Sequence, residues 1–124
     1  MNTGRKISGG RYHKSRKKKK FELKGQSRIA KLGKEKRKKI RAIGGHLKTV
    51  LLSTDTCNLI DKKTRKSVKV KITNVLETPS NKFLARQNIL TKGAIIETDK
   101  GKAKITNRPG QEGSVQAILI EEAM

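Results

Sequence analysis

The amino-acid sequence predicts a mainly β fold, a small β-barrel with one short helix, preceded by a long, extended and basic N-terminal arm. Two observations support this prediction. From Ile40 onward, short apolar stretches alternate with turn residues, which is typical of β structure. Before that point positive charge dominates, and the first 48 of the 124 residues carry +17 of the net charge of +22. We therefore divide the chain into a basic arm, residues 1–38, and a β-barrel domain, residues 39–124.

The N-terminal arm has too many cations and too few apolar residues to fold alone. Only Glu22 and Glu35 oppose the 19 Lys and Arg residues found between residues 1 and 48. Such a segment repels itself in water, so we expect it to be disordered when the protein is free. Residues 26–39 allow a short helix or a continuation of the arm. We favour the arm, because Gly33 interrupts the helical spacing and the cations face every direction.

The barrel domain begins with four candidate strands, at residues 38–43, 46–54, 57–61 and 67–76. The second is apolar on both of its faces, which indicates that it is buried on both sides. The fourth is the clearest, because apolar residues alternate strictly with Lys and Thr along it. This alternation predicts one face in the core and one face of exposed cations and hydroxyl groups.

The distal half of the domain predicts one helix and three more strands. A cap at Thr78 or Ser80 begins the helix, which runs to about Asn88 and presents Phe83 and Leu84 to the core. Strands follow at residues 94–98, 102–106 and 115–120, before an acidic end at residues 121–124. Closing these strands into a barrel removes their exposed edges, and a two-sheet sandwich is the alternative.

Composition argues against a secreted or membrane protein. No apolar run approaches the roughly 20 residues that a spanning helix needs. Residues 1–10 lack the apolar centre of a signal peptide. The single cysteine, Cys57, cannot form an internal disulfide and fits a reducing compartment. We expect a soluble, cytoplasmic protein with no membrane partner.

No motif predicts catalysis. The sequence has no Walker phosphate loop, dinucleotide-binding glycine pattern or nucleophile elbow. His13, His46 and Cys57 are too few for a structural zinc site, which takes four ligands in paired spacing. His46 and Cys57 could form a nucleophile pair, but a packed cysteine is the interpretation that we favour. We predict a protein that is not an enzyme and has no cofactor, metal or small-molecule substrate.

The charge instead predicts a polyanionic partner, and we interpret that partner as nucleic acid. The aromatic residues are only Tyr12, Phe21 and Phe83, too few for a platform on which bases stack. Binding should therefore depend on phosphates and shape, with little base readout. Two alternatives stay open: a DNA-binding protein of nucleoid or chromatin type, and a regulatory domain whose arm docks on an acidic protein.

The order of several segments is more specific than the composition. These are Gly9-Gly10, the basic run 16–20, Phe21-Glu22-Leu23, the stretch 40–46 (IRAIGGH), the stretch 86–96 (RQNILTKGAII) and the stretch 106–113 (TNRPGQEG). Together they resemble small-subunit ribosomal protein eight of the archaeal and eukaryotic type, in its compact archaeal form. The resemblance covers nearly the whole chain.

The resemblance implies a β-barrel packed on ribosomal RNA of the small subunit, with the basic arm threaded into the RNA. It also implies neighbouring ribosomal proteins as partners and a chain that is monomeric when free. RNA contacts carried over from the family are Arg5, Lys6, Gly9, Gly10, Arg11, Arg16, Lys17, Lys18, Lys19, Lys20, Arg41, Gly44, Gly45 and His46. The charge and position of the arm add Tyr12, His13, Lys14, Lys24, Arg28, Lys31, Lys36, Arg37, Lys38 and Lys48.

Overall fold

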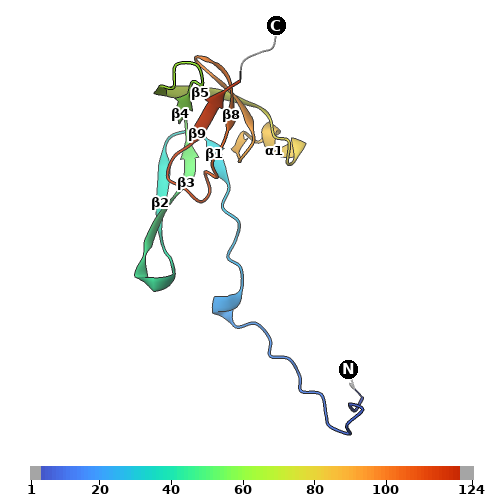
Figure 1. Cartoon of the computed structure of the whole chain (residues 1–124). Coiled ribbons are helices and arrows are strands. Elements are labelled where there is room, and N and C mark those ends of the chain that lie inside the picture. Colours follow the sequence, from blue (N-terminus) through green and yellow to red (C-terminus); the bar gives the residue numbers. More distant parts are fainter. Residues whose placement is uncertain (1–3, 121–124) are drawn as a thin grey trace.

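Five strands close into a barrel, as the sequence predicted. Their order is β4 (Thr56–Ile60), β5 (Ser67–Glu77), β7 (Ile95–Thr98), β8 (Gly101–Ile105) and β9 (Gln116–Leu119). Successive neighbours are antiparallel, and a parallel pairing between β4 and β9 closes the ring. Figure 1 shows the barrel at the end of the molecule farthest from the N-terminus. The structure is a computed structural model that describes residues 4–120, so the acidic end at residues 121–124 lies outside the described residues.

A second sheet lies beside the barrel and was not foreseen as a separate unit. Its four strands are ordered β2 (Lys36–Arg41), β3 (Leu47–Thr54), β1 (Ala30–Leu32) and β6 (Ile89–Leu90). The sequence predicts β3 as a strand of the barrel, but this strand pairs with β2 and β1 instead. One residue, Asp55, connects β3 to β4, so the chain passes directly from this sheet into the barrel.

Residues 26–39 are not helical, and our preference for a simple continuation of the arm was wrong for half of them. They contain β1 and the first part of β2. The strand β1 runs parallel to β3 and antiparallel to β6, so both of its partners lie far along the sequence. The boundary predicted between residues 38 and 39 falls inside β2.

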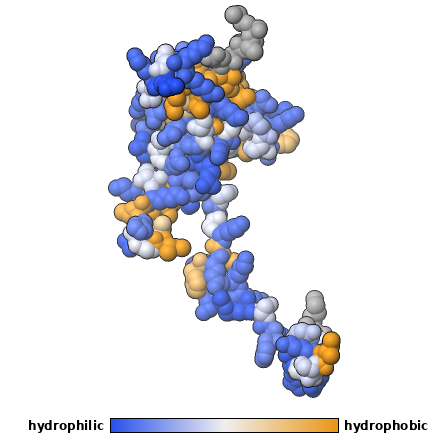
Figure 2. Space-filling model, viewed as in Figure 1, coloured by the Kyte–Doolittle hydropathy of each residue, from blue (hydrophilic) through white to orange (hydrophobic). Residues whose placement is uncertain are grey.

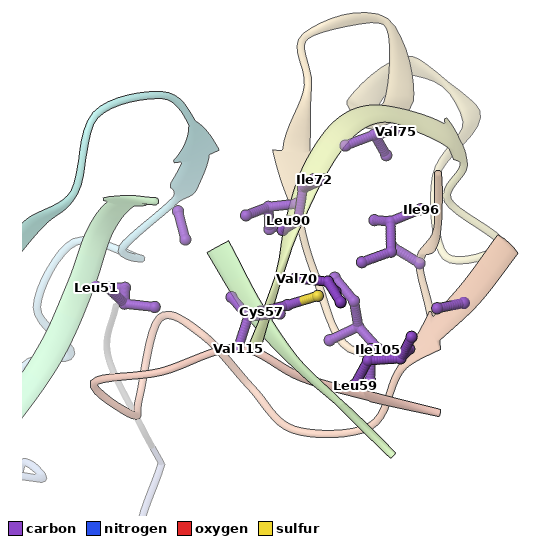
Figure 3. Close-up of a cluster of buried hydrophobic side chains, with 14 residues drawn as sticks. Leu51, Cys57, Leu59, Val70, Ile72, Val75, Leu90, Ile96, Ile105 and Val115 are labelled. Carbon is purple, nitrogen blue, oxygen red and sulfur yellow. The ribbon is translucent and has the colours of Figure 1, made fainter. Parts of the chain in front are cut away.

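The barrel and the second sheet share one hydrophobic core. Figure 3 shows Leu51 and Leu90 from the second sheet in the same cluster as Cys57, Ile96 and Ile105 from the barrel. All five residues are at most 2% exposed. Burying a large apolar side chain stabilises a fold by about 1.5–3 kcal/mol. The shared core therefore holds the second sheet in a fixed position on the barrel.

The strand β5 follows the predicted alternation and then bends. Val70 and Ile72 are buried, whereas Lys69 and Lys71 are exposed. The pairing of β5 with β7 shifts register twice, near residues 72–74 and 75–77. Such irregularities increase the local twist and help a sheet to curve into a barrel.

The single α-helix, α1 (Lys82–Arg86), is shorter than predicted and has a different cap. The side chain of Asn81, rather than that of Thr78 or Ser80, accepts the N–H of Phe83 at 3.0 Å. Phe83 was predicted to lie in the core, but its side chain is 68% exposed. A helix of five residues turns only a narrow face to the core, and here Leu84 and Ala85 are the half-buried residues on it.

Candidate nucleic-acid interface

Residues 4–29, here called the extended segment, leave the body of the protein as an exposed strip. Every residue in this range is exposed. Figure 1 shows it running away from the barrel and the second sheet toward the N-terminus. Its cations are therefore available over their full length to a partner that lies along the chain.

The N-terminal end of the extended segment forms a small hairpin. The backbones of Arg5 and Arg11 pair as an antiparallel bridge, and the N–H of Gly9 donates to the carbonyl of Lys6 at 2.8 Å. Gly9 has φ of 81°, a conformation that glycine adopts at little cost. The ammonium group of Lys6 lies 5.6 Å from the centroid of the Tyr12 ring, within cation–π range. This hairpin carries three cations, and one of them lies against an aromatic ring.

A second local structure, the 3-10 turn η1 (Lys20–Glu22), depends on one carboxylate. Glu22 accepts a hydrogen bond from the Arg16 guanidinium at 2.7 Å and another from the backbone N–H of Lys19 at 2.9 Å. Both contacts hold the pKa of Glu22 below its ordinary value, and the Arg16 contact has the larger effect. Phe21 is 81% exposed in this turn. The turn thus presents an aromatic ring within the most basic run of the sequence.

The hairpin formed by β2 and β3 carries the next group of cations. Because β2 lies at the edge of the second sheet, one of its sides has no neighbouring strand among the described residues. All of its residues are exposed except the half-buried Ile40. At the tip, η2 (Ile43–Gly45) contains Gly44 and Gly45 at φ of 78° and 77°. Figure 2 shows an apolar patch at this tip, and Ile43 and Leu47 are 98% and 68% exposed.

The loop of residues 106–115 fixes the places where the extended segment and the hairpin join the body. The side chain of Asn107 donates to the carbonyl of Ser114 at 2.6 Å and accepts the N–H of Gln116 at 2.9 Å. The carbonyl of Pro109 accepts the N–H of Leu51 in β3 at 3.2 Å. Lys48 donates a hydrogen bond to Gln111. The loop therefore secures β3, and with it the direction of the hairpin.

The cations of residues 4–48 are largely uncompensated within the described part of the chain. Both acidic residues of this range are already paired, Glu22 with Arg16 at 2.7 Å and Glu35 with Arg37 at 2.5 Å. Among the described residues, no carboxylate pairs with the other cations of this range. These cations repel one another, and a bound polyanion would relieve that repulsion.

The structure divides the predicted site residues between two elements. One group lies on the extended segment: Arg5, Lys6, Gly9, Gly10, Arg11, Tyr12, His13, Lys14, Arg16, Lys17, Lys18, Lys19, Lys20, Lys24 and Arg28. A second group lies on the β2–β3 hairpin: Lys36, Arg37, Lys38, Arg41, Gly44, Gly45, His46 and Lys48. Lys31 lies apart from both, exposed on β1.

Two residues of the same exposed cationic surface were missed. Lys34 precedes β2, and Lys39 lies within it between two predicted residues. The continuous run of cations from residue 36 to residue 39 was the signal that would have included Lys39. Lys48 fits the site less well than predicted, because it is half-buried and already hydrogen-bonded to Gln111.

The described residues show no feature of a catalytic or metal centre. Within residues 4–120, no group of three or more His, Cys, Asp or Glu side chains could hold a metal ion. Cys57 is 2% exposed, and burial, with a smaller effect of Asp99, raises the pKa of its thiol to about 11. None of the helices in the same range is long and apolar enough to cross a membrane.

Fold and surface together define a class, a small basic β-barrel protein that presents uncompensated charge on an extended segment and on one hairpin. The chain belongs to the family of ribosomal protein S8e, whose model matches residues 1–120. The resemblance drawn from the sequence motifs is thereby confirmed, and it includes both the extended segment and the barrel.

Relatives named small ribosomal subunit protein eS8 match nearly the whole chain. The protein of Methanocorpusculum labreanum is 48% identical over 117 residues, which cover 94% of each chain. That of Methanococcus aeolicus is 49% identical over 119 residues, covering 95% of this chain and 93% of the relative. That of Sulfurisphaera tokodaii is 46% identical over 122 residues, covering 98% and 95%.

Proposed function

We propose that this protein is a structural constituent of the small ribosomal subunit that binds ribosomal RNA through phosphate and shape contacts. The observation that carries the proposal is the uncompensated charge of residues 4–48 in a chain of the ribosomal protein S8e family. The relatives from the three archaea are named as small-subunit proteins. We extend that role to this chain, in the cytoplasm, with neighbouring ribosomal proteins as further partners.

The binding mechanism is electrostatic. Each phosphate that a Lys or Arg neutralises releases condensed counterions, which gives a log–log salt slope of roughly −0.7 to −0.9 per phosphate. If about 10 cations engage, affinity falls by orders of magnitude between low and moderate salt. The site residues are those assigned above to the extended segment, to β1 and to the β2–β3 hairpin. Phosphate contacts of this kind position a protein without reading sequence.

The two parts of the chain have different tasks in this mechanism. In the free protein, the extended segment is a disordered arm up to the place where its end rests on the loop at Gly110, and it takes up one conformation as it enters the RNA. This ordering lowers the net affinity but lets the segment reach between RNA helices that the barrel cannot enter. The barrel and the second sheet are rigid because they share a core, so they set the direction of the segment.

Sedimentation tests the proposal. A tagged copy of the protein would be sedimented from lysate through a gradient at high salt and quantified against a known small-subunit protein. We expect one copy per small subunit after the wash. A variant that lacks residues 1–25 should keep a folded barrel but lose stable incorporation. Wild-type protein that stays at the top of the gradient, or follows DNA, would contradict the proposal and favour a general DNA-binding protein.

A further inference from the structure

Phe83 is the one aromatic residue of the sequence outside the extended segment, and nothing in the described fold covers it. Its side chain is 68% exposed on α1, which Figure 1 shows projecting from the side of the body. The opposite side of the helix does the packing, because Ala85 lies against the buried core. The fold therefore does not require an aromatic ring at this position.

The ring is held beside a cation. The guanidinium of Arg86 lies 6.0 Å from the centroid of the Phe83 ring, a cation–π arrangement between residues three apart on the helix. Lys82 is exposed at the start of the same helix. Neither cation forms an ion pair with a carboxylate within residues 4–120. Two positive charges without a carboxylate partner thus flank one exposed ring.

An open groove of about 470 Å³ lies between α1 and β5, and the two cations of the helix line it, while the Phe83 ring lies outside the groove beside Arg86. Asn74, Lys82, Arg86 and Asn88 supply most of its polar lining. The side-chain oxygen of Asn74 accepts the N–H of Val75 at 2.9 Å. Its amide nitrogen has no hydrogen-bond partner among the described residues. The groove is open and mainly polar, and its amide groups can hydrogen-bond to the edges of bases.

We propose that this corner of the protein binds a single unpaired RNA base. The base stacks on Phe83, the phosphate of the same nucleotide or of its neighbour meets Arg86 and Lys82, and the amides of Asn74 and Asn88 contact the base edge. This inference rests on the proposed function and goes beyond it, because phosphate and shape contacts alone read no base. It assigns base recognition to α1, in the body of the protein.

The chemistry of the site favours RNA over a protein neighbour. The centre of a protein interface is depleted in Lys and is more apolar than the rest of the protein surface. Here a five-residue helix presents two cations next to the ring, and the groove beside it is lined mostly by polar side chains. Aromatic side chains flanked by positive charge are the usual means of holding an unstacked base.

The test compares variants of the full chain on a small-subunit ribosomal RNA transcript. Because stacking on an aromatic side chain is worth about 1–3 kcal/mol per base, F83A should weaken binding by about tenfold. Its salt slope should stay unchanged, because no charge is removed. R86Q should instead reduce the magnitude of the log–log salt slope by about 0.7 to 0.9, which is the contribution of one phosphate contact. V68A is the matched control, since Val68 is an exposed apolar residue on β5 (41% exposed) away from α1.

Chemical probing of the bound transcript gives the second readout. Wild-type protein should protect one unpaired base that becomes reactive again with F83A, while the other protections persist. F83W should restore both protection and affinity, because it keeps a stacking surface. F83L should restore neither, because it keeps apolar bulk without an aromatic face.

Three results would overturn the inference. F83A that binds and protects the transcript as wild type does would show that no base rests on the ring. Loss of incorporation into subunits with unchanged binding to naked RNA, rescued by F83L, would identify a protein neighbour instead. Wild-type protein that fails to bind the transcript at all would overturn the proposed function as well, which separates the two failures.

Discussion

At the scale of single residues, Cys57 shows how burial decides the reactivity of a side chain. Cys57 is packed in the core among Leu59, Val70 and Ile105 (Figure 3). Burial raises the pKa of its thiol to about 11, so the thiol is protonated at neutral pH. A protonated thiol is a weak nucleophile. The packed-cysteine interpretation is thus confirmed, and pairing with His46 as a catalytic nucleophile finds no support in this environment.

The buried thiol predicts slow alkylation. At pH 8, iodoacetamide should modify Cys57 at least about a hundredfold more slowly in the folded protein than in urea, because modification must wait for the core to open. Equal alkylation rates with and without urea would contradict this prediction.

The same thiol predicts how stability depends on pH. Its pKa in the folded state lies above the ordinary value of 9.0, so the thiol of the unfolded chain loses its proton first as pH rises. The free energy of unfolding should therefore fall as pH rises from about 9 to about 11.

At the scale of secondary-structure elements, the length of each element decided what the sequence could predict. Eleven-residue β5 shows the period of two clearly enough to assign both faces. The strands β1 and β6 have three and two residues, too few to show any period. Their pairing depends on strands far along the chain, which local patterns cannot reveal. The prediction that Phe83 lies in the core was wrong for a related reason, because apolar character alone did not show which face of a five-residue helix was buried.

The candidate interface was predictable in composition but not in arrangement. The cationic residues of the candidate interface could be identified from the sequence, because their positive charge depends only on residue type. The division of those cations between an extended segment and the β2–β3 hairpin required knowledge of β2, which the sequence placed partly within the arm. The carboxylate of Glu22 likewise acquires its role only through contacts with Arg16 and Lys19.

The end of the extended segment lies against the loop at Gly110. A side chain introduced at Gly110 should therefore clash with the backbone of the segment. A Cβ atom at Gly110 would lie 2.8 Å from the backbone oxygen of Arg28. The neighbouring carbonyl of Pro109 is hydrogen-bonded to Leu51, so the loop cannot move away without loss. G110A should therefore cost about 1–3 kcal/mol of stability. In a thermal melt followed by circular dichroism, this corresponds to a Tm lowered by roughly 4 °C or more.

The matched control for that substitution is G25A. A Cβ atom added at Gly25 would meet no atom within 4 Å beyond the adjoining residues, and the φ of Gly25 is not positive. The Tm of G25A should therefore stay within about 1 °C of wild type. A G110A variant that melts with wild type would show that the segment does not rest on the loop.

At the scale of the whole molecule, charge and hydrophobic core are separated in space. The buried cluster lies in the barrel and the second sheet, while the densest charge lies along the extended segment, where no residue is buried (Figures 1 and 2). Mutual repulsion among these cations therefore acts on a part of the chain that contributes little to folding. Stability and polyanion binding can change independently of each other.

This separation predicts that equal numbers of charges have unequal effects. Replacing Lys14, Lys17, Lys18, Lys19 and Lys20 by Gln removes five cations of the extended segment and leaves the Arg16–Glu22 pair in place. The matched control replaces five exposed lysines of the body: Lys66, Lys69, Lys71, Lys92 and Lys104. Both variants have the same net charge, so non-specific attraction to RNA is lowered equally.

Binding to the ribosomal RNA transcript would then be measured as a function of salt. If each lysine of the extended segment neutralises one phosphate, the segment variant should lose about 3.5 to 4.5 from the log–log slope. The body variant should lose less, because those lysines lie outside the proposed contact surface. Tm should stay close to wild type for the segment variant, since the substituted side chains are exposed and outside the core. Equal loss of slope in the two variants would mean that net charge, rather than the extended segment, governs binding.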